Sequence, residues 1–143
     1  MFIPGIPAPQ GSKNAYQRGG RIVLVEASKK LKPWRDHVRE QLQLNYDLGN
    51  CQSWTDEPEH PIGVTLIFAM PKPKTNKRNR PTTKPDLDKL CRAILDAGTG
   101  VIWKDDAQVV AIHATKVWAQ LTEPGVYIDV YDANNDLVTH ASL

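Results

Sequence analysis

The chain has 143 residues, of which 41% are hydrophobic and 24% charged, and its formal net charge at pH 7 is +2. This length and composition are ordinary for one globular domain, so we expect residues 1–143 to fold as a single unit. The sequence has no apolar run of membrane-spanning length, no signal-peptide pattern and no CxxC pair, so we expect a cytoplasmic protein with reduced thiols.

The charges are divided unevenly along the chain. All Lys and Arg residues lie at or before Lys116, so the first 116 residues carry a net charge of about +6 and the remainder about −4. Local basic density attracts nucleic acids more than net charge does. A solvated surface would also explain this pattern, and charge alone does not identify the ligand.

The first half of the chain predicts strands and one helix. The opening FIPGIPAPQGSKN is punctuated by Pro and Gly and predicts an edge strand before a basic turn. RIVLV (21–25) predicts a short strand that returns from the turn at 18–20. Leu31, Trp34, Val38 and Leu42 recur at helical spacing and predict a helix from about residue 28 or 32 to 43. The polar residues 45–61 predict a connecting loop.

The second half begins with the most apolar segment. IGVTLIFAM (62–70) is apolar on both faces and predicts a central strand. The loop 71–85 contains four prolines, which exclude a helix, and six cations: Lys72, Lys74, Lys77, Arg78, Arg80 and Lys84. An amphipathic helix follows with apolar positions at Leu87, Leu90, Cys91, Ile94 and Leu95, and Gly98 and Gly100 end it.

The C-terminal third predicts two more strands, at 109–118 and 126–131, joined as a hairpin around 123–125. The polar tail from about residue 133 is expected to be partly disordered. Together these elements predict an α/β (α+β) domain with a mixed β-sheet flanked by two main helices.

Two pairs of carboxylates are the main chemical signal. Asp86 and Asp88 are at the start of the second predicted helix, and Asp105 and Asp106 immediately precede a predicted strand. Each pair alone has an ordinary structural explanation, because acids at a helix N-terminus cap free N–H groups. The intervening loop is short, and we expect it to bring both pairs to one end of the sheet. Gathered carboxylates repel one another, and a divalent cation with oxygen ligands would relieve that repulsion.

Cations accompany these acids. Arg92 lies four residues from both Asp88 and Asp96, so it could form a surface ion pair or present its charge to a phosphate. The predicted phosphate-binding residues are Lys13, Arg21, Lys72, Lys74, Lys77, Arg78, Arg80, Lys84 and Lys89. Carboxylates for a metal beside cations for a polyanion predict a metal-dependent nuclease.

The order of three blocks resembles the RusA family of Holliday junction resolvases, which are small bacterial and phage endonucleases. The blocks are PDLDKL (85–90), LDA (95–97) and GVIWKDDAQVV (100–110), and GIPAPQGSKN resembles the family's N-terminal strand and basic turn. The likeness is strong over residues 84–118 and weak at the N-terminal strand. The catalytic aspartates of the family correspond to Asp86, Asp88 and Asp106, and Asp105 is the neighbouring acid of the metal-binding set.

The resemblance implies a homodimer that resolves four-way junction DNA by paired symmetric nicks in recombination and repair. It implies Mg²⁺ as cofactor, with Mn²⁺ able to substitute, no nucleotide cofactor, and a phage or prophage origin in a bacterial cytoplasm. Two residues depart from the family pattern: Lys89 stands where Asn is common, and Arg92 stands where a catalytic Lys is common. Arginine keeps the charge but does not give up a proton, so charge stabilisation survives and a general-acid role becomes doubtful.

Two other classes of function stay open at this point. A non-catalytic branched-DNA-binding protein would use the acids only as helix caps and would bind without metal-dependent cutting. A glycosyltransferase-like protein would use the Asp-x-Asp motif to hold a metal–nucleotide complex. This chain is short for that role and shows no nucleotide-binding half.

Overall fold

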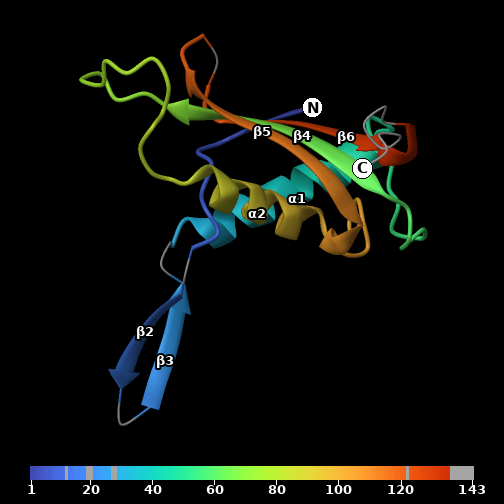
Figure 1. Cartoon of the computed structure of the whole chain (residues 1–143), viewed down its shortest axis with the longest axis horizontal. Coiled ribbons are helices and arrows are strands. Elements are labelled where there is room, and N and C mark those ends of the chain that lie inside the picture. Colours follow the sequence, from blue (N-terminus) through green and yellow to red (C-terminus); the bar gives the residue numbers. More distant parts are fainter. Residues whose placement is uncertain (12, 19–20, 27–28, 122, 136–143) are drawn as a thin grey trace, which may run out of the picture.

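The most apolar segment of the chain forms the central strand β4 (Ile62–Pro71), as predicted. The computed structural model describes residues 1–11, 13–18, 21–26, 29–121 and 123–135, and for 13–18, 21–26 and 135 it describes the backbone. β4 pairs in parallel with β5 (Val109–Ala119) and antiparallel with β6 (Gly125–Asp132). β1 (Phe2–Pro4) completes a mixed sheet of order β1-β6-β4-β5 (Figure 1). The predicted fold class is confirmed.

Two helices cover one face of this sheet (Figure 1). Alternate residues of β4 point toward them, and Val64, Leu66 and Phe68 are all 0% exposed. α1 (Leu31–Asp47) buries the apolar positions predicted for it. It runs past the predicted end at residue 43, where the side chain of Gln43 donates a hydrogen bond to Asp47 at 2.9 Å.

The predicted hairpin between the last two strands is wrong. Both segments form strands, but β4 lies between β5 and β6, and each pairs with β4 instead. A buried central strand needs hydrogen-bond partners on both edges, and β5 and β6 together supply them. The turn near 123–125 therefore carries the chain across β4.

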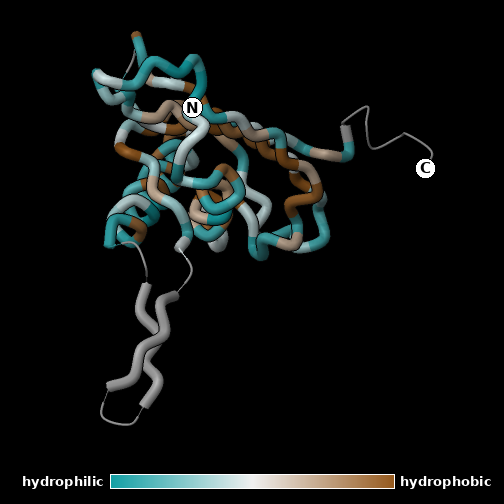
Figure 2. Tube along the Cα trace, turned by 60° about the vertical axis from the view of Figure 1, so that its left-hand side comes forward, coloured by the Kyte–Doolittle hydropathy of each residue, from teal (hydrophilic) through white to brown (hydrophobic). Residues whose placement is uncertain are grey.

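A second, two-stranded sheet projects from the body of the molecule. β2 (Lys13–Arg18) pairs with β3 (Arg21–Glu26) in antiparallel register from Lys13↔Glu26 to Arg18↔Arg21. The predicted return strand is thus confirmed, and Figure 1 shows the hairpin extending away from the sheet and helices. Figure 2 shows hydrophobic residues along the strands of the main sheet.

The helix α2 (Leu87–Gly98) connects the parallel strands β4 and β5, so it runs antiparallel to both. Its start lies near the far end of β5, because the Lys116 ammonium donates to the Pro85 carbonyl at 2.8 Å. Its end leads through the short helix η1 (Asp106–Gln108) into the first residue of β5. The two ends of α2 therefore lie near opposite ends of β5. Among the described residues, neither helix is long and apolar enough to cross a membrane.

Candidate active site

The acidic pair, Asp86 and Asp88, stands at the first turn of α2. Asp86 occupies the N-cap position, but within the described chain its side chain makes no capping hydrogen bond to the helix. Its carboxylate lies instead 3.8 Å from the Lys84 ammonium and 3.9 Å from the Lys89 ammonium. Asp88 is exposed one turn into the helix. Asp86 therefore does not cap the helix with its side chain. The carboxylates of Asp86 and Asp88 are both exposed to solvent, so their oxygens can bind a ligand.

The acidic cluster, Asp96, Asp105 and Asp106, lies at the other end of α2. Asp105 caps η1, because its carboxylate accepts a hydrogen bond from the Ala107 amide at 2.9 Å. That hydrogen bond lowers the pKa of Asp105, and the one it shares with Asp106 lowers it further. The same shared hydrogen bond raises the pKa of Asp106, with added effects from burial and from the charges of Asp105 and Asp96. A cation bound at this cluster would stabilise the ionised form of Asp106.

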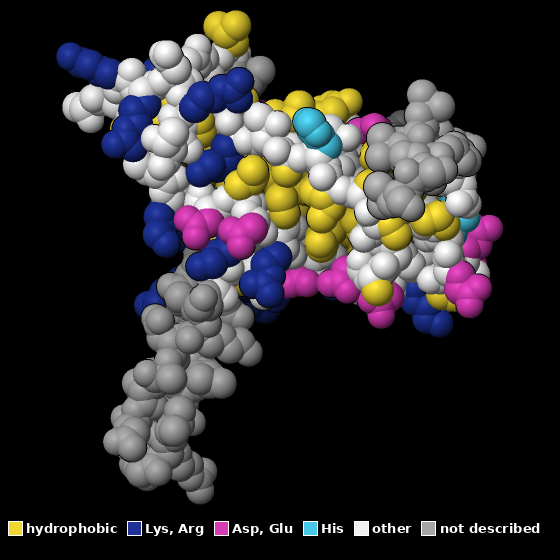
Figure 3. Space-filling view, in the orientation of Figure 1, with side chains coloured by type: hydrophobic (Ala, Val, Ile, Leu, Met, Phe, Trp, Pro, Cys, Tyr) yellow, Lys and Arg dark blue, Asp and Glu magenta, His cyan; other side chains and the backbone are white. Residues whose placement is uncertain are grey.

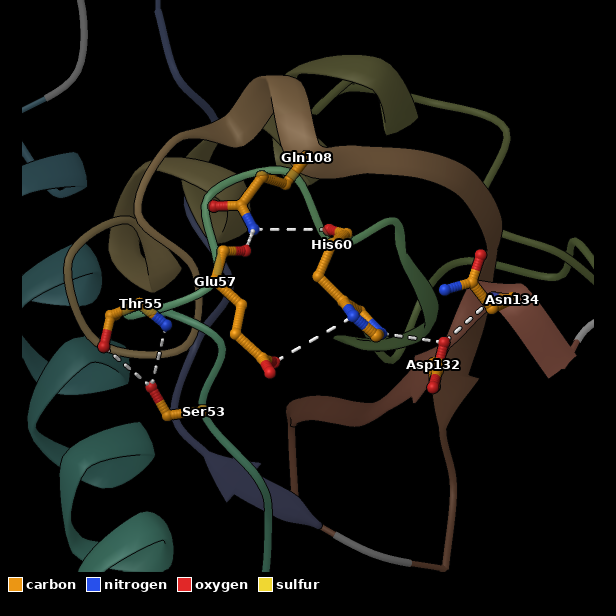
Figure 4. Close-up of polar contacts among 7 residues, drawn as sticks. All are labelled: Ser53, Thr55, Glu57, His60, Gln108, Asp132 and Asn134. Carbon is orange, nitrogen blue, oxygen red and sulfur yellow. Dashed lines mark hydrogen bonds and ion pairs between the residues drawn. The ribbon is translucent and has the colours of Figure 1, made fainter.

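Gln108 fixes the segment that carries the acidic cluster. Its side-chain oxygen accepts from the amides of Lys104 and Asp105 at 2.8 and 3.2 Å, which closes a capping box around η1. Its side-chain nitrogen donates to the carbonyls of Glu57 at 2.9 Å and His60 at 3.3 Å (Figure 4). The side chain is only 6% exposed. The acids at 105 and 106 are thus held by a buried amide that bridges two loops.

A cavity of about 350 Å³ opens beside the acidic cluster. Gln10, Gly11, Arg92, Leu95, Asp96 and Asp106 line it. The N-terminal segment reaches this place because the Gln10 amide donates to the Lys89 carbonyl of α2 at 2.9 Å. The Gln10 side-chain oxygen is buried and has no hydrogen-bond partner among the described residues. An unpartnered buried carbonyl oxygen is costly, and a cation or a cation-bound water in the cavity would satisfy it.

The expectation that both carboxylate pairs meet at one end of the sheet is wrong within one protomer. Asp88 and Asp96 are eight residues apart, which is roughly 12 Å along the axis of a helix. Among the described residues, no group of three or more His, Cys, Asp or Glu side chains is placed to hold a metal ion. The reason is that α2 is the crossover connection between the parallel strands β4 and β5. It begins at Asp86 and Asp88 and runs along the sheet before the chain reaches Asp105 and Asp106.

The basic loop (residues 72–85) lies beside the acidic pair. Lys72, Lys74, Lys77, Arg78, Arg80 and Lys84 are all exposed on it, and Figure 3 shows Lys and Arg side chains gathered around this loop and the helix start. The Trp118 indole donates to the Arg78 carbonyl at 2.9 Å and ties the loop to β5. Lys13 and Arg21 fall on the projecting hairpin, and their side chains lie outside the described residues.

Two site residues were missed from the sequence. Asp96 had a signal, because it lies at helical spacing from Arg92 and within the LDA block. Gln10 had only its place in the weakly matching GIPAPQGSKN block, because it is the packing of the N-terminal segment along α2 that brings it to the cavity.

Comparison with known proteins identifies the family. The model of the endodeoxyribonuclease RusA family matches residues 4–131. The chain is also 33% identical over 142 residues to the uncharacterized protein YqaN of Bacillus subtilis (strain 168), covering 92% of this chain and 94% of that relative.

Proposed function

The chain belongs to the RusA family of endodeoxyribonucleases, and on that premise we propose that it resolves four-way DNA junctions by paired symmetric nicks. The proposed reaction is in-line attack of water on the scissile phosphorus. The new bond forms between the water oxygen and phosphorus, and the bond to the 3′ oxygen breaks. The attacking water loses one proton and the departing 3′ oxygen takes one up, so the products are a 5′-phosphate and a 3′-hydroxyl. The observation that carries this proposal is the uncapped Asp86 carboxylate at the start of α2, beside the basic loop.

The side chains present fit a hard divalent cation such as Mg²⁺ or Mn²⁺. Carboxylates are available at both ends of α2, and the Gln10 side-chain oxygen is buried without a partner among the described residues. Asp86, Asp88 and Asp106 are the proposed ligands, and Asp105, which also caps η1, is the neighbouring acid. The bound cation supplies Lewis-acid polarisation of the phosphate and a water of lowered pKa.

A two-fold homodimer would bring the separated acids together. The exposed face of α2 carries Asp88, Arg92 and Asp96 at intervals of four residues. Two copies of α2 packed antiparallel about an axis near Arg92 would set Asp88 of each protomer against the acidic cluster of the other. Val110 is 58% exposed and Ile112 46% exposed on the adjoining edge strand, where Figure 3 shows hydrophobic side chains between sheet and helix. This arrangement would bury them and give two equivalent sites for two symmetric nicks.

The remaining charged residues would position the substrate. Arg92, exposed between the two acidic ends, would offset the negative charge that develops on the phosphate during attack. The basic loop, Lys89, Lys13 and Arg21 would contact phosphates of the junction arms, which fixes position without reading sequence. A DNA substrate of this kind places the protein in the cytoplasm of a bacterial or phage-infected cell.

Cleavage of a synthetic mobile four-way junction tests the proposal. We expect paired symmetric nicks with Mg²⁺, none with EDTA, and loss of cutting in Asp88→Asn with junction binding retained. Asp36→Asn is the matched control, because Asp36 is a half-exposed α1 acid whose partner is Lys32. Tight junction binding without cutting under any divalent metal would reject the enzyme and leave a branched-DNA-binding protein.

A further inference from the structure

A second cavity, of about 430 Å³, adjoins the acidic pair but contains none of the acids. We call it the proline pocket, because six prolines contribute to its lining: Pro7, Pro9, Pro71, Pro73, Pro81 and Pro85. They come from the N-terminal segment, the end of β4 and the basic loop. Proline has a fixed φ angle, so walls of this kind are largely pre-formed and lose little conformational entropy on binding.

The walls of the proline pocket are apolar and include an aromatic ring. Met70 is 5% exposed and Trp118 9% exposed, whereas Ile6 is 58% exposed and stands at the mouth. The Trp118 indole is held by its hydrogen bond to the Arg78 carbonyl. Apolar and aromatic walls of this kind suit a flat ring, and every nucleobase has a π-face that stacks without regard to sequence.

The polar groups of the pocket divide into structural and available ones. The Lys116 ammonium donates to the carbonyls of Thr83 at 2.9 Å and Pro85 at 2.8 Å, so it holds the wall in place. Lys30 and Lys84 are exposed and give the pocket a cationic rim. Asn76 also lines it: its side-chain oxygen accepts a hydrogen bond from the Arg78 amide at 2.9 Å, and its side-chain NH₂ group can donate to the acceptor edge of a base. An apolar slot with a cationic rim matches a flat ring that carries a phosphate.

The position of the pocket determines which nucleotide would enter. Pro85 lines it and directly precedes Asp86, and the Lys84 ammonium at its rim lies 3.8 Å from the Asp86 carboxylate. We propose that the proline pocket takes one unstacked nucleobase of the junction, next to the phosphate that is cut. It thereby sets the base preference at the cut site. This inference rests on the proposed function for the identity of the DNA.

Fluorescence of 2-aminopurine placed at successive positions around the crossover tests base capture. With EDTA present and no cutting, we expect the wild-type protein to change the emission at one position by at least about twofold. Ile6→Trp, which narrows the exposed mouth, should abolish that change. Leu121→Trp is the matched control, because Leu121 is 99% exposed and is not part of the pocket.

Nick mapping gives the second readout. In Mg²⁺, Ile6→Trp and Asn76→Ala should spread the nicks more evenly over junctions that differ at the captured base, while total cutting persists. No position-specific emission change in the wild type, or variants that match Leu121→Trp in both readouts, would overturn the inference. An emission change in a protein that does not cut in Mg²⁺ would reject the proposed nuclease function but support base binding in the proline pocket. Failure of the proposed function can therefore be distinguished from failure of this inference.

Discussion

Arg92 is the cation to which the proposed reaction assigns stabilisation of the negative charge that develops on the phosphate. It lines the cavity that also contains Asp96 and Asp106, and it is exposed. Because a guanidinium does not give up its proton, its contribution must come from charge and hydrogen bonding.

Substitution of Arg92 separates these roles. Arg92→Ala should lower the single-turnover cleavage rate by about 10²–10³-fold, the cost of removing one group that stabilises transition-state charge. Arg92→Lys should stay within about tenfold of wild type, because the charge is kept. A lysine variant as slow as the alanine variant would show that the guanidinium geometry, and not the charge, is required.

Gln108 is not an acid of the acidic cluster, but its hydrogen bonds position the segment that contains Asp105 and Asp106. Gln108→Ala removes four hydrogen bonds of a buried side chain, and we expect the free energy of unfolding to fall by about 2–3 kcal/mol. Urea denaturation measures this change. Lys104→Ala, at the exposed neighbouring side chain, should change stability by less than about 0.5 kcal/mol. Equal stability of the two variants would contradict the bridging role.

The basic loop is the element whose contribution can be measured apart from catalysis. Lys74→Ala and Lys77→Ala should each reduce the slope of log affinity against log salt by about 1, because each cation neutralises one phosphate. Binding titrations at several salt concentrations give the slope for junction and duplex DNA. Lys32→Ala is the control, because Lys32 is on α1 and pairs with Asp36 at 2.6 Å. An unchanged slope in both loop variants would show that these two lysines do not contact DNA phosphates.

The assembly of two protomers determines whether the acidic residues at the two ends of α2 contribute to the same active site. If each site is shared between protomers, mixing inactive Asp88→Asn protein with inactive Asp106→Asn protein should restore nicking of one strand. The mixed dimer then has one site with both native residues and one with neither. If each site lies within one protomer, every site in the mixture has one defect and no cutting returns.

The control for this mixing experiment uses the same end of the helix. Asp86→Asn mixed with Asp88→Asn restores no intact site under either arrangement, so it should stay inactive. Strand-specific labelling of the junction distinguishes single nicks from paired ones. Activity in the control mixture would mean that residual activity, and not complementation, is being measured.

Local sequence pattern predicted most of the strands and both main helices, and it suggested a candidate site rich in carboxylates. The apolar run at 62–70 predicted β4, and the spacing from Leu87 to Leu95 predicted α2 with Asp86 at its start. These signals are short-range, because periodicity and turn chemistry depend on residues a few positions apart. The family blocks around Asp88 and Asp106 also follow from local sequence order.

The way in which these parts meet depends on the tertiary structure. It inserted β4 between β5 and β6, separated the acidic pair from the acidic cluster by the length of α2, and brought Gln10 to the cavity. It also assembled the proline pocket from three distant segments. Each of these outcomes depends on which strand edges pair and which way the crossover helix runs. Long-range pairing of this kind leaves no periodic trace in the chain, so local pattern could suggest candidate site residues but not how the fold arranges them.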